Sequence, residues 1–90
     1  MESNQPNSYK FEDINEGMTL EGHYTITASV YEGFISTFKD LSPIHIDLTY
    51  ALAQGFSGLV MHGAILNGFI SHFLGMQFPG RTGLLLSTSL

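Results

Sequence analysis

The sequence predicts an α+β fold in which one long apolar helix is wrapped by a curved sheet. Two segments rich in β-branched, aromatic or aliphatic residues, 19–27 and 84–90, predict strands. Between them, residues 59–75 are apolar on almost every side, and a helix that is hydrophobic all round must be buried. Small residues on this helix, including Gly63 and Gly68, would let other backbone approach closely, as a sheet wrapped around a helix requires.

The chain divides into a short tail and one domain. Residues 1–8 are polar and contain a proline, so we expect a disordered tail followed by a single domain over residues 9–90. Two strands cannot cover a long apolar helix, and a two-stranded sheet is barely stable alone. Either the domain is truncated after the strand following the long helix, or a second subunit completes it, or the chain is not a stable monomer, and of these we expect truncation.

A shorter helix and a helical turn are expected before the long helix. Thr27 or Ser29 can cap a helix that carries apolar residues at helical intervals, and Ser29 has the spacing of a capping box. Pro43 disfavours helix at the residue before it, so residues 40–47 are expected to form a loop. Asp47 can then cap a brief helical turn.

Composition excludes several classes of function. The net charge of -5 has the wrong sign for a partner such as nucleic acid or an anionic membrane surface. Without cysteine, disulfides and thiolate catalysis are excluded. The apolar run 59–75 is shorter than the ~20 residues of a membrane span, and the start of the chain lacks the apolar stretch of a secretory signal. We expect a cytoplasmic protein with no membrane span.

The densest polar cluster is the predicted loop, which carries Asp40, Ser42, His45 and Asp47. A carboxylate and an imidazole five positions apart can converge on one water molecule and act as an acid/base pair. The alternative is that both aspartates cap backbone N–H groups and His45 only packs. An Asp and a His at this separation are common, so the pair taken alone favours the alternative.

A second candidate site is Met61-His62-Gly63 at the start of the long helix. Free N–H groups at a helix N-terminus can hold a carbonyl oxygen that develops negative charge. Equally, Gly63 can serve tight packing, and His62 can satisfy a backbone group. A metal site made of the aspartates and histidines is the competing hypothesis, but no ligand spacing favours zinc or iron, so we expect no metal.

Residues 38–45 (FKDLSPIH), followed after five intervening residues by Ala51, resemble the hydratase signature of MaoC-like proteins. That signature runs Gly-Asp-x-Asn-Pro-aliphatic-His and then a small residue. The similarity continues in the family's order through Gly55-Phe56, Met61-His62-Gly63 and Pro79-Gly80. It extends from Tyr9 to the end of the chain.

The resemblance implies a hot-dog fold, which is a long central helix wrapped by a curved antiparallel sheet and is usually dimeric. It implies an (R)-specific enoyl-CoA hydratase, which adds water reversibly to a trans-2-enoyl thioester to give the (R)-3-hydroxyacyl thioester. By position, Asp40 would be the general base, and His45 would help to hold the water and move the proton. The N–H of Gly63 would polarise the thioester carbonyl.

Ser42, Pro43, His62 and Gly68 are expected to bind substrate, again from the resemblance. Water would be the co-substrate, the acyl group would be carried by CoA or acyl carrier protein, and no metal or nucleotide cofactor is implied. The expected partner is a second copy in a homodimer or a complementing subunit. Two positions depart from the signature, because Lys39 replaces its glycine and Ser42 its asparagine.

Two alternatives to a hydratase stay open. A hot-dog fragment without activity could serve as a binding or dimerisation module. Hot-dog folds also host thioesterases, but the Asp40 to His45 signature argues against thioester hydrolysis.

Overall fold

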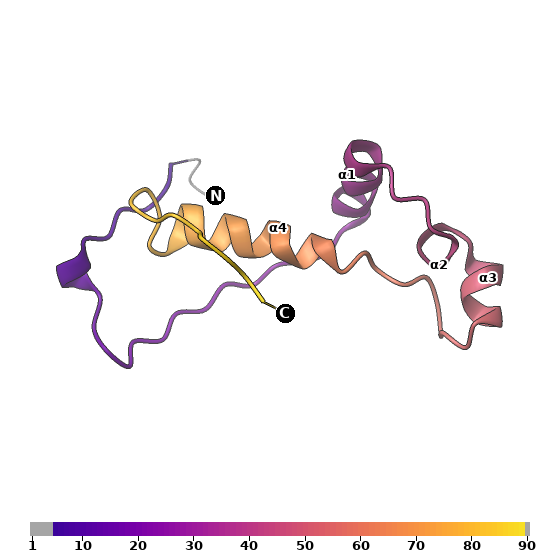
Figure 1. The fold of residues 1–90 in the computed structure, drawn as a ribbon, viewed down its shortest axis with the longest axis horizontal. Coiled ribbons are helices and arrows are strands. Elements are labelled where there is room, and N and C mark those ends of the chain that lie inside the picture. Colours follow the sequence, from indigo (N-terminus) through magenta and orange to yellow (C-terminus); the bar gives the residue numbers. More distant parts are fainter. Residues whose placement is uncertain (1–4, 90) are drawn as a thin grey trace. The chain divides into compact units, whose positions relative to one another are not determined.

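The computed structural model describes residues 5–89. The helices are η1 (Phe11–Asp13), α1 (Ala28–Phe38), α2 (Pro43–Ile46), α3 (Leu48–Ala53), α4 (Ala64–His72) and the π-helical turn η2 (Phe73–Gln77) (Figure 1). The chain forms two compact units, one with residues up to Tyr24 and from Leu66 onward, the other with Thr25–Ile65. None of the helices within residues 5–89 has the length and apolarity needed to span a bilayer.

The helix expected in the Thr25–Ile65 unit is confirmed as α1. Its N-cap is Thr27 rather than Ser29, and the Thr27 hydroxyl accepts a hydrogen bond from the N–H of Val30 at 3.2 Å. The helix ends at Lys39, which adopts the left-handed conformation with φ 61° and donates its N–H to the carbonyl of Ile35 at 2.9 Å. This left-handed residue turns the chain away from the helix axis immediately before Asp40.

The loop predicted over residues 40–47 is wrong in its second half, because Pro43–Ile46 form the short helix α2. Proline is well suited to the first helical position, since its φ is already helical and its missing N–H needs no partner there. The restriction that Pro43 places on Ser42 does hold, because Ser42 lies outside the helix with ψ 134°. Asp47 caps α3 as expected, accepting from the N–H of Tyr50 at 3.1 Å.

The segment that follows α3 returns beside α2. Val60 donates its N–H to the carbonyl of Ile44 at 2.9 Å. The N–H of Phe56 bonds to the carbonyl of Ala51 at 3.1 Å, and Ala51 is completely buried. The complete burial of Ala51 explains why a small residue stands at position 51. The hydrogen bond between Val60 and Ile44 places the residues just before α4 alongside α2.

The long apolar helix is shorter than predicted and is not buried on every side. It begins at Ala64 instead of residue 59, because the preceding residues are extended beside α2. Within α4, Ile65 is buried, whereas Leu66 keeps 42% of its surface exposed. The physical reason is that no sheet covers the helix within the described residues.

Neither predicted strand is paired. Residues 19–27 and 83–89 contain no strand, Leu90 lies outside the described residues, and the β-pairing within residues 5–89 is a single antiparallel bridge between Ser8 and Gly80. A strand needs a neighbour for its N–H and C=O groups. The first segment instead packs on α4, where the rings of Tyr24 and Phe69 lie 4.8 Å apart.

Asn7, which lies in the segment expected to be a tail, is hydrogen-bonded near the turn that follows η2, and the next residue, Ser8, forms the bridge to Gly80. The N–H of Asn7 bonds to Met76 and its carbonyl accepts from Arg81, both at 2.8 Å. Gly80 has φ 79°, and a Cβ there would lie 2.0 Å from the Asn7 carbonyl oxygen, so glycine is required. Residues 1–4 of the predicted tail lie outside the described residues.

Candidate active site

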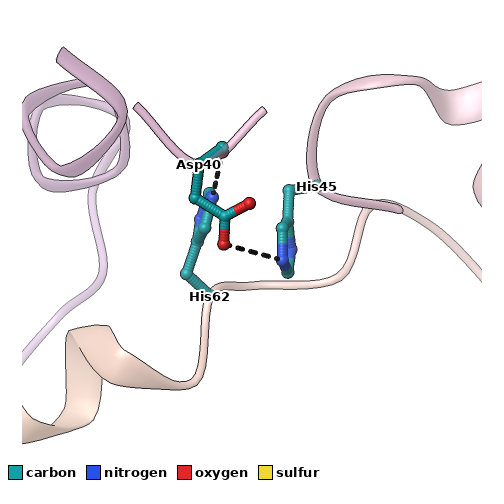
Figure 2. A group of neighbouring side chains, drawn as sticks. All are labelled: Asp40, His45 and His62. Atoms are coloured by element: carbon teal, nitrogen blue, oxygen red, sulfur yellow. Dashed lines mark hydrogen bonds and ion pairs between the residues drawn. The ribbon is translucent and has the colours of Figure 1, made fainter. Parts of the chain in front are cut away.

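Three polar side chains from separate segments of the Thr25–Ile65 unit meet (Figure 2). Asp40 follows α1, His45 lies in α2, and His62 lies in the extended segment before α4. One potential ligand atom from each of the three lies within 4.8 Å of the others. The turn at Pro43 and the return of the chain beside α2 bring them together.

Asp40 uses its two carboxylate oxygens differently. Oδ1 accepts a hydrogen bond from the N–H of Ser42 at 3.1 Å, which fixes the turn into α2. Oδ2 faces Nε2 of His45 at 3.8 Å, as the dashed line in Figure 2 marks. The Asp40 side chain is 50% exposed. One oxygen therefore holds local structure and the other is available for chemistry.

The tautomer of His45 follows from its hydrogen bond to the backbone. Nδ1 lies 2.6 Å from the carbonyl oxygen of Val60, and because a carbonyl only accepts, Nδ1 carries the hydrogen. In the neutral ring, Nε2 then holds a lone pair, which faces Asp40. Tyr31 donates its O–H to the carbonyl of His45, and burial raises the pKa of Tyr31, which favours the protonated donor.

The gap between Asp40 and His45 suits a shared water molecule. At 3.8 Å, Oδ2 and Nε2 are too far apart for a good direct hydrogen bond. With neutral His45 both atoms are acceptors, and a water molecule can donate one hydrogen to each of them. Such a water has its oxygen lone pairs free and a base on either side, which is the arrangement for adding water to an electrophilic carbon.

His62 is buried against both partners. Its ring is 2% exposed and stacks on His45 with centroids 3.8 Å apart and planes at 24°. Nε2–H donates to the backbone carbonyl of Asp40 at 2.9 Å, whereas the buried Nδ1 has no hydrogen-bond partner in the described part of the chain. The rings of Tyr31 and Phe34 lie 5.3 Å and 4.7 Å away. The substrate-binding role expected of His62 stays a prediction, and within the described residues its ring is covered by its protein neighbours.

The other predicted site residues lie at varied places. Ser42 and Pro43 are the N-cap and first residue of α2. Gly63 is exposed between His62 and α4, and the N–H of Ile65 in the first turn of the helix bonds to the carbonyl of His62 at 3.1 Å. A Cβ on Gly63 would meet nothing within 4 Å, so tight packing within the described residues does not require this glycine. Gly68 lies on α4 in the other compact unit.

Sequence reasoning missed three groups that position the site. Tyr31 and Phe34 are three residues apart on α1 and so share a helix face, which the sequence could have indicated. The third group is the carbonyl of Val60, which receives the hydrogen bond of His45. A backbone acceptor leaves no signal in residue type, so only the fold reveals it.

The three side chains offer metal ligands, but their orientation suits a metal ion poorly. Imidazole lone pairs lie in the ring plane, and the rings of His45 and His62 are nearly parallel and stacked. Two such lone pairs do not converge on one ion, and Nε2 of His62 already donates to Asp40. The arrangement therefore fits a bound water between Asp40 and His45 better than a metal.

Comparison with known proteins identifies three relatives among curated sequences. The chain is 35% identical over 80 residues to an (R)-specific enoyl-CoA hydratase of Rhodospirillum rubrum, covering 89% of this chain and 56% of that protein. It is 32% identical over 63 residues to the (R)-specific enoyl-CoA hydratase of Aeromonas caviae, covering 70% and 47%. It is 32% identical over 80 residues to a 3-hydroxybutyryl-CoA dehydratase of Methylorubrum extorquens, covering 89% and 51%.

The chain thus spans about half the length of the curated relatives it matches. No family model matches the sequence. No solved structure matches it either. By name, two of these relatives are hydratases and one is a dehydratase, and at 32–35% identity they support a MaoC-like hydratase family for this chain.

Proposed function

We propose that the whole protein is a hydro-lyase that adds water reversibly to a trans-2-enoyl thioester and forms the (R)-3-hydroxyacyl thioester. The observation that carries this proposal is the pair of acceptor atoms, Asp40 Oδ2 and His45 Nε2, which face one another across 3.8 Å. The names of the three relatives support the same class of reaction.

The first half of the reaction uses the water held by Asp40 and His45. The water oxygen bonds to C3 of the enoyl group while one of its O–H bonds breaks and that proton passes to Asp40 Oδ2. The electrons of the C2–C3 double bond move toward the thioester carbonyl oxygen. His45 keeps the water oriented through Nε2, and its own ring is held by the Nδ1–H bond to Val60.

The second half needs a site for negative charge and a proton donor. The N–H of Gly63, at the N-terminus of α4, stabilises the oxyanion of the enolate. The proton taken from water is then delivered to C2 by the Asp40–His45 pair, so that water is added in full and both groups return to their starting state. Dehydration is the same sequence in reverse.

The proposed substrate is an acyl thioester, and its binding residues lie at the start of α2 and on α4. The acyl group is carried by CoA or acyl carrier protein, water is the co-substrate, and no metal or nucleotide takes part. Ser42 and Pro43 border the acyl thioester, and Gly68 on α4 belongs to the same substrate-binding set. A CoA thioester is highly charged and stays in the aqueous compartment, which supports the cytoplasmic location expected from the sequence.

A hot-dog sheet and a dimer partner are also part of the proposal. Apolar surface on α4 keeps substantial exposure, with Leu66 at 42%. A curved sheet around α4, in this subunit or shared with a second copy, would remove that apolar surface from water. The same surface supports the alternative of a binding or dimerisation module without activity.

The test is the loss of enoyl-thioester absorbance when the whole protein meets crotonyl-CoA. The proposal expects consumption of crotonyl-CoA, formation of the (R)-3-hydroxy product and no release of free thiol. Asp40→Asn and His45→Gln should each abolish most of this activity. A folded protein that leaves crotonyl-CoA unchanged would favour the binding module, and thiol release would indicate a thioesterase.

A further inference from the structure

His62 contacts both members of the proposed Asp40–His45 pair, and its own ring is buried. Figure 2 shows its ring beside that of His45, with its hydrogen bond to the Asp40 backbone. We infer that His62 is a positioning residue that sets the distance between Asp40 and His45 through one buried ring. The inference rests on the proposed function and changes the role of His62 from substrate contact to support.

The first link runs from His62 to the backbone of Asp40. Nε2–H donates to the Asp40 carbonyl at 2.9 Å. Asp40 directly follows Lys39, whose left-handed conformation turns the chain out of α1. The hydrogen bond holds this exposed turn at its carbonyl, and so limits the freedom of the carboxylate that faces His45.

The second link is the stack on His45. The two rings lie 3.8 Å apart and almost parallel, so His62 covers one face of His45. The carbonyl of Val60 holds the Nδ1 edge of His45 at 2.6 Å. A ring held at one face and one edge has little freedom to rotate, and its Nε2 is directed at Asp40 Oδ2.

The hydrogen-bonding state of the two ring nitrogens of His62 argues against a purely structural role. Its Nδ1 is buried and has no partner among residues 5–89, and burying a polar atom without a partner destabilises the folded state. Phenylalanine would fill the space between Tyr31, Phe34 and His45 without that penalty. What imidazole adds at position 62 is the Nε2–H donor to Asp40.

Two substitutions separate the two links. His62→Phe keeps an aromatic ring against His45 and removes the donor to Asp40. His62→Gln keeps an N–H donor on a side chain of similar reach and removes the ring. His23→Gln is the matched control, because the His23 side chain is 89% exposed and lies in the other unit.

Both variants should lower kcat for crotonyl-CoA by about tenfold or more, because a small misplacement of reacting groups is costly, while KM stays within about threefold. His62→Phe should keep its melting temperature within about 5 °C of the wild type. His23→Gln should leave kcat unchanged. A kcat within about twofold of wild type in both variants would overturn the inference, as would a rise in KM at constant kcat, which is the signature of substrate binding.

A measurement on the unaltered whole protein tests the inference without activity and without relying on a variant that folds. Nitrogen NMR shifts of the imidazoles distinguish protonated from unprotonated ring nitrogens. The inference requires hydrogen on Nε2 of His62 and on Nδ1 of His45 in the unaltered protein. Hydrogen on Nδ1 of a neutral His62 ring would overturn it. The required tautomers in a protein that does not hydrate crotonyl-CoA would refute the proposed function alone.

Discussion

Replacing Asp40 by asparagine removes one negative charge and changes one acceptor into a donor. The carbonyl oxygen of asparagine can still accept from the N–H of Ser42, as Oδ1 does at 3.1 Å. That hydrogen bond turns the NH2 group toward His45, where Oδ2 lies in the wild type. The bound water then meets one donor and one acceptor in place of two acceptors, and its base is gone.

The expected effect on activity is much larger than the effect on stability. A positioned general base contributes a factor of about 10² to 10⁴, which corresponds to about 3–5 kcal/mol of activation free energy. The Asp40 side chain is 50% exposed and 3.8 Å from His45, and ion pairs with this exposure are worth less than about 1 kcal/mol. We therefore expect kcat to fall at least about a hundredfold with little change in the free energy of unfolding.

The assay is the loss of crotonyl-CoA absorbance by the whole protein, combined with urea unfolding of the same samples. Asp47→Asn is the matched control, because it removes the same charge from the same stretch of chain. Its side chain caps α3 by accepting from Tyr50, and asparagine caps equally well. An Asp40→Asn enzyme with kcat within about threefold of wild type, or a loss that Asp47→Asn reproduces, would refute the assignment of Asp40 as the base.

Three further predictions concern the surroundings of the pair. Gly63→Pro removes the proposed oxyanion N–H and should lower kcat by about 10²-fold or more, whereas Gly63→Ala keeps the N–H and should retain most activity; equal losses would contradict the N–H role. Lys39→Gly should raise the free energy of unfolding by about 0.5–1 kcal/mol in urea titrations, because φ 61° favours glycine; a lower stability would show that the lysine side chain contributes more than the strain costs. Burial raises the pKa of Tyr31 above 10.0, the ordinary value for tyrosine, so above pH 10.0 the unfolded state loses this proton while the folded state keeps it. The free energy of unfolding should therefore fall with rising pH more steeply in the wild type than in Tyr31→Phe. Parallel curves for the two proteins would contradict the raised pKa.

Local chemistry in the sequence predicted the helices of the Thr25–Ile65 unit well. The caps of α1 and α3 depend on Thr27 and Asp47 and on residues three positions away, so they are visible in the sequence. The prediction of a loop at α2 was wrong for an equally local reason. Pro43 was expected to exclude helix, but it occupies the first helical position, where proline is favoured. The predicted strands are not paired within the described residues, because pairing depends on a neighbouring strand, which residue type does not specify.

The sequence by itself determined the resemblance to MaoC-like hydratases, because the order Asp40, Pro43, His45 and Gly63 is a property of the chain, and it named the two groups proposed to act on water. Only the tertiary structure decided how these two groups are held. The tautomer of His45 depends on the Val60 carbonyl, fifteen positions away, and the support of Asp40 depends on His62, twenty-two positions away. Hydrogen bonds to backbone and the burial of a ring arise from how the chain returns on itself, and no spacing of residue types encodes them.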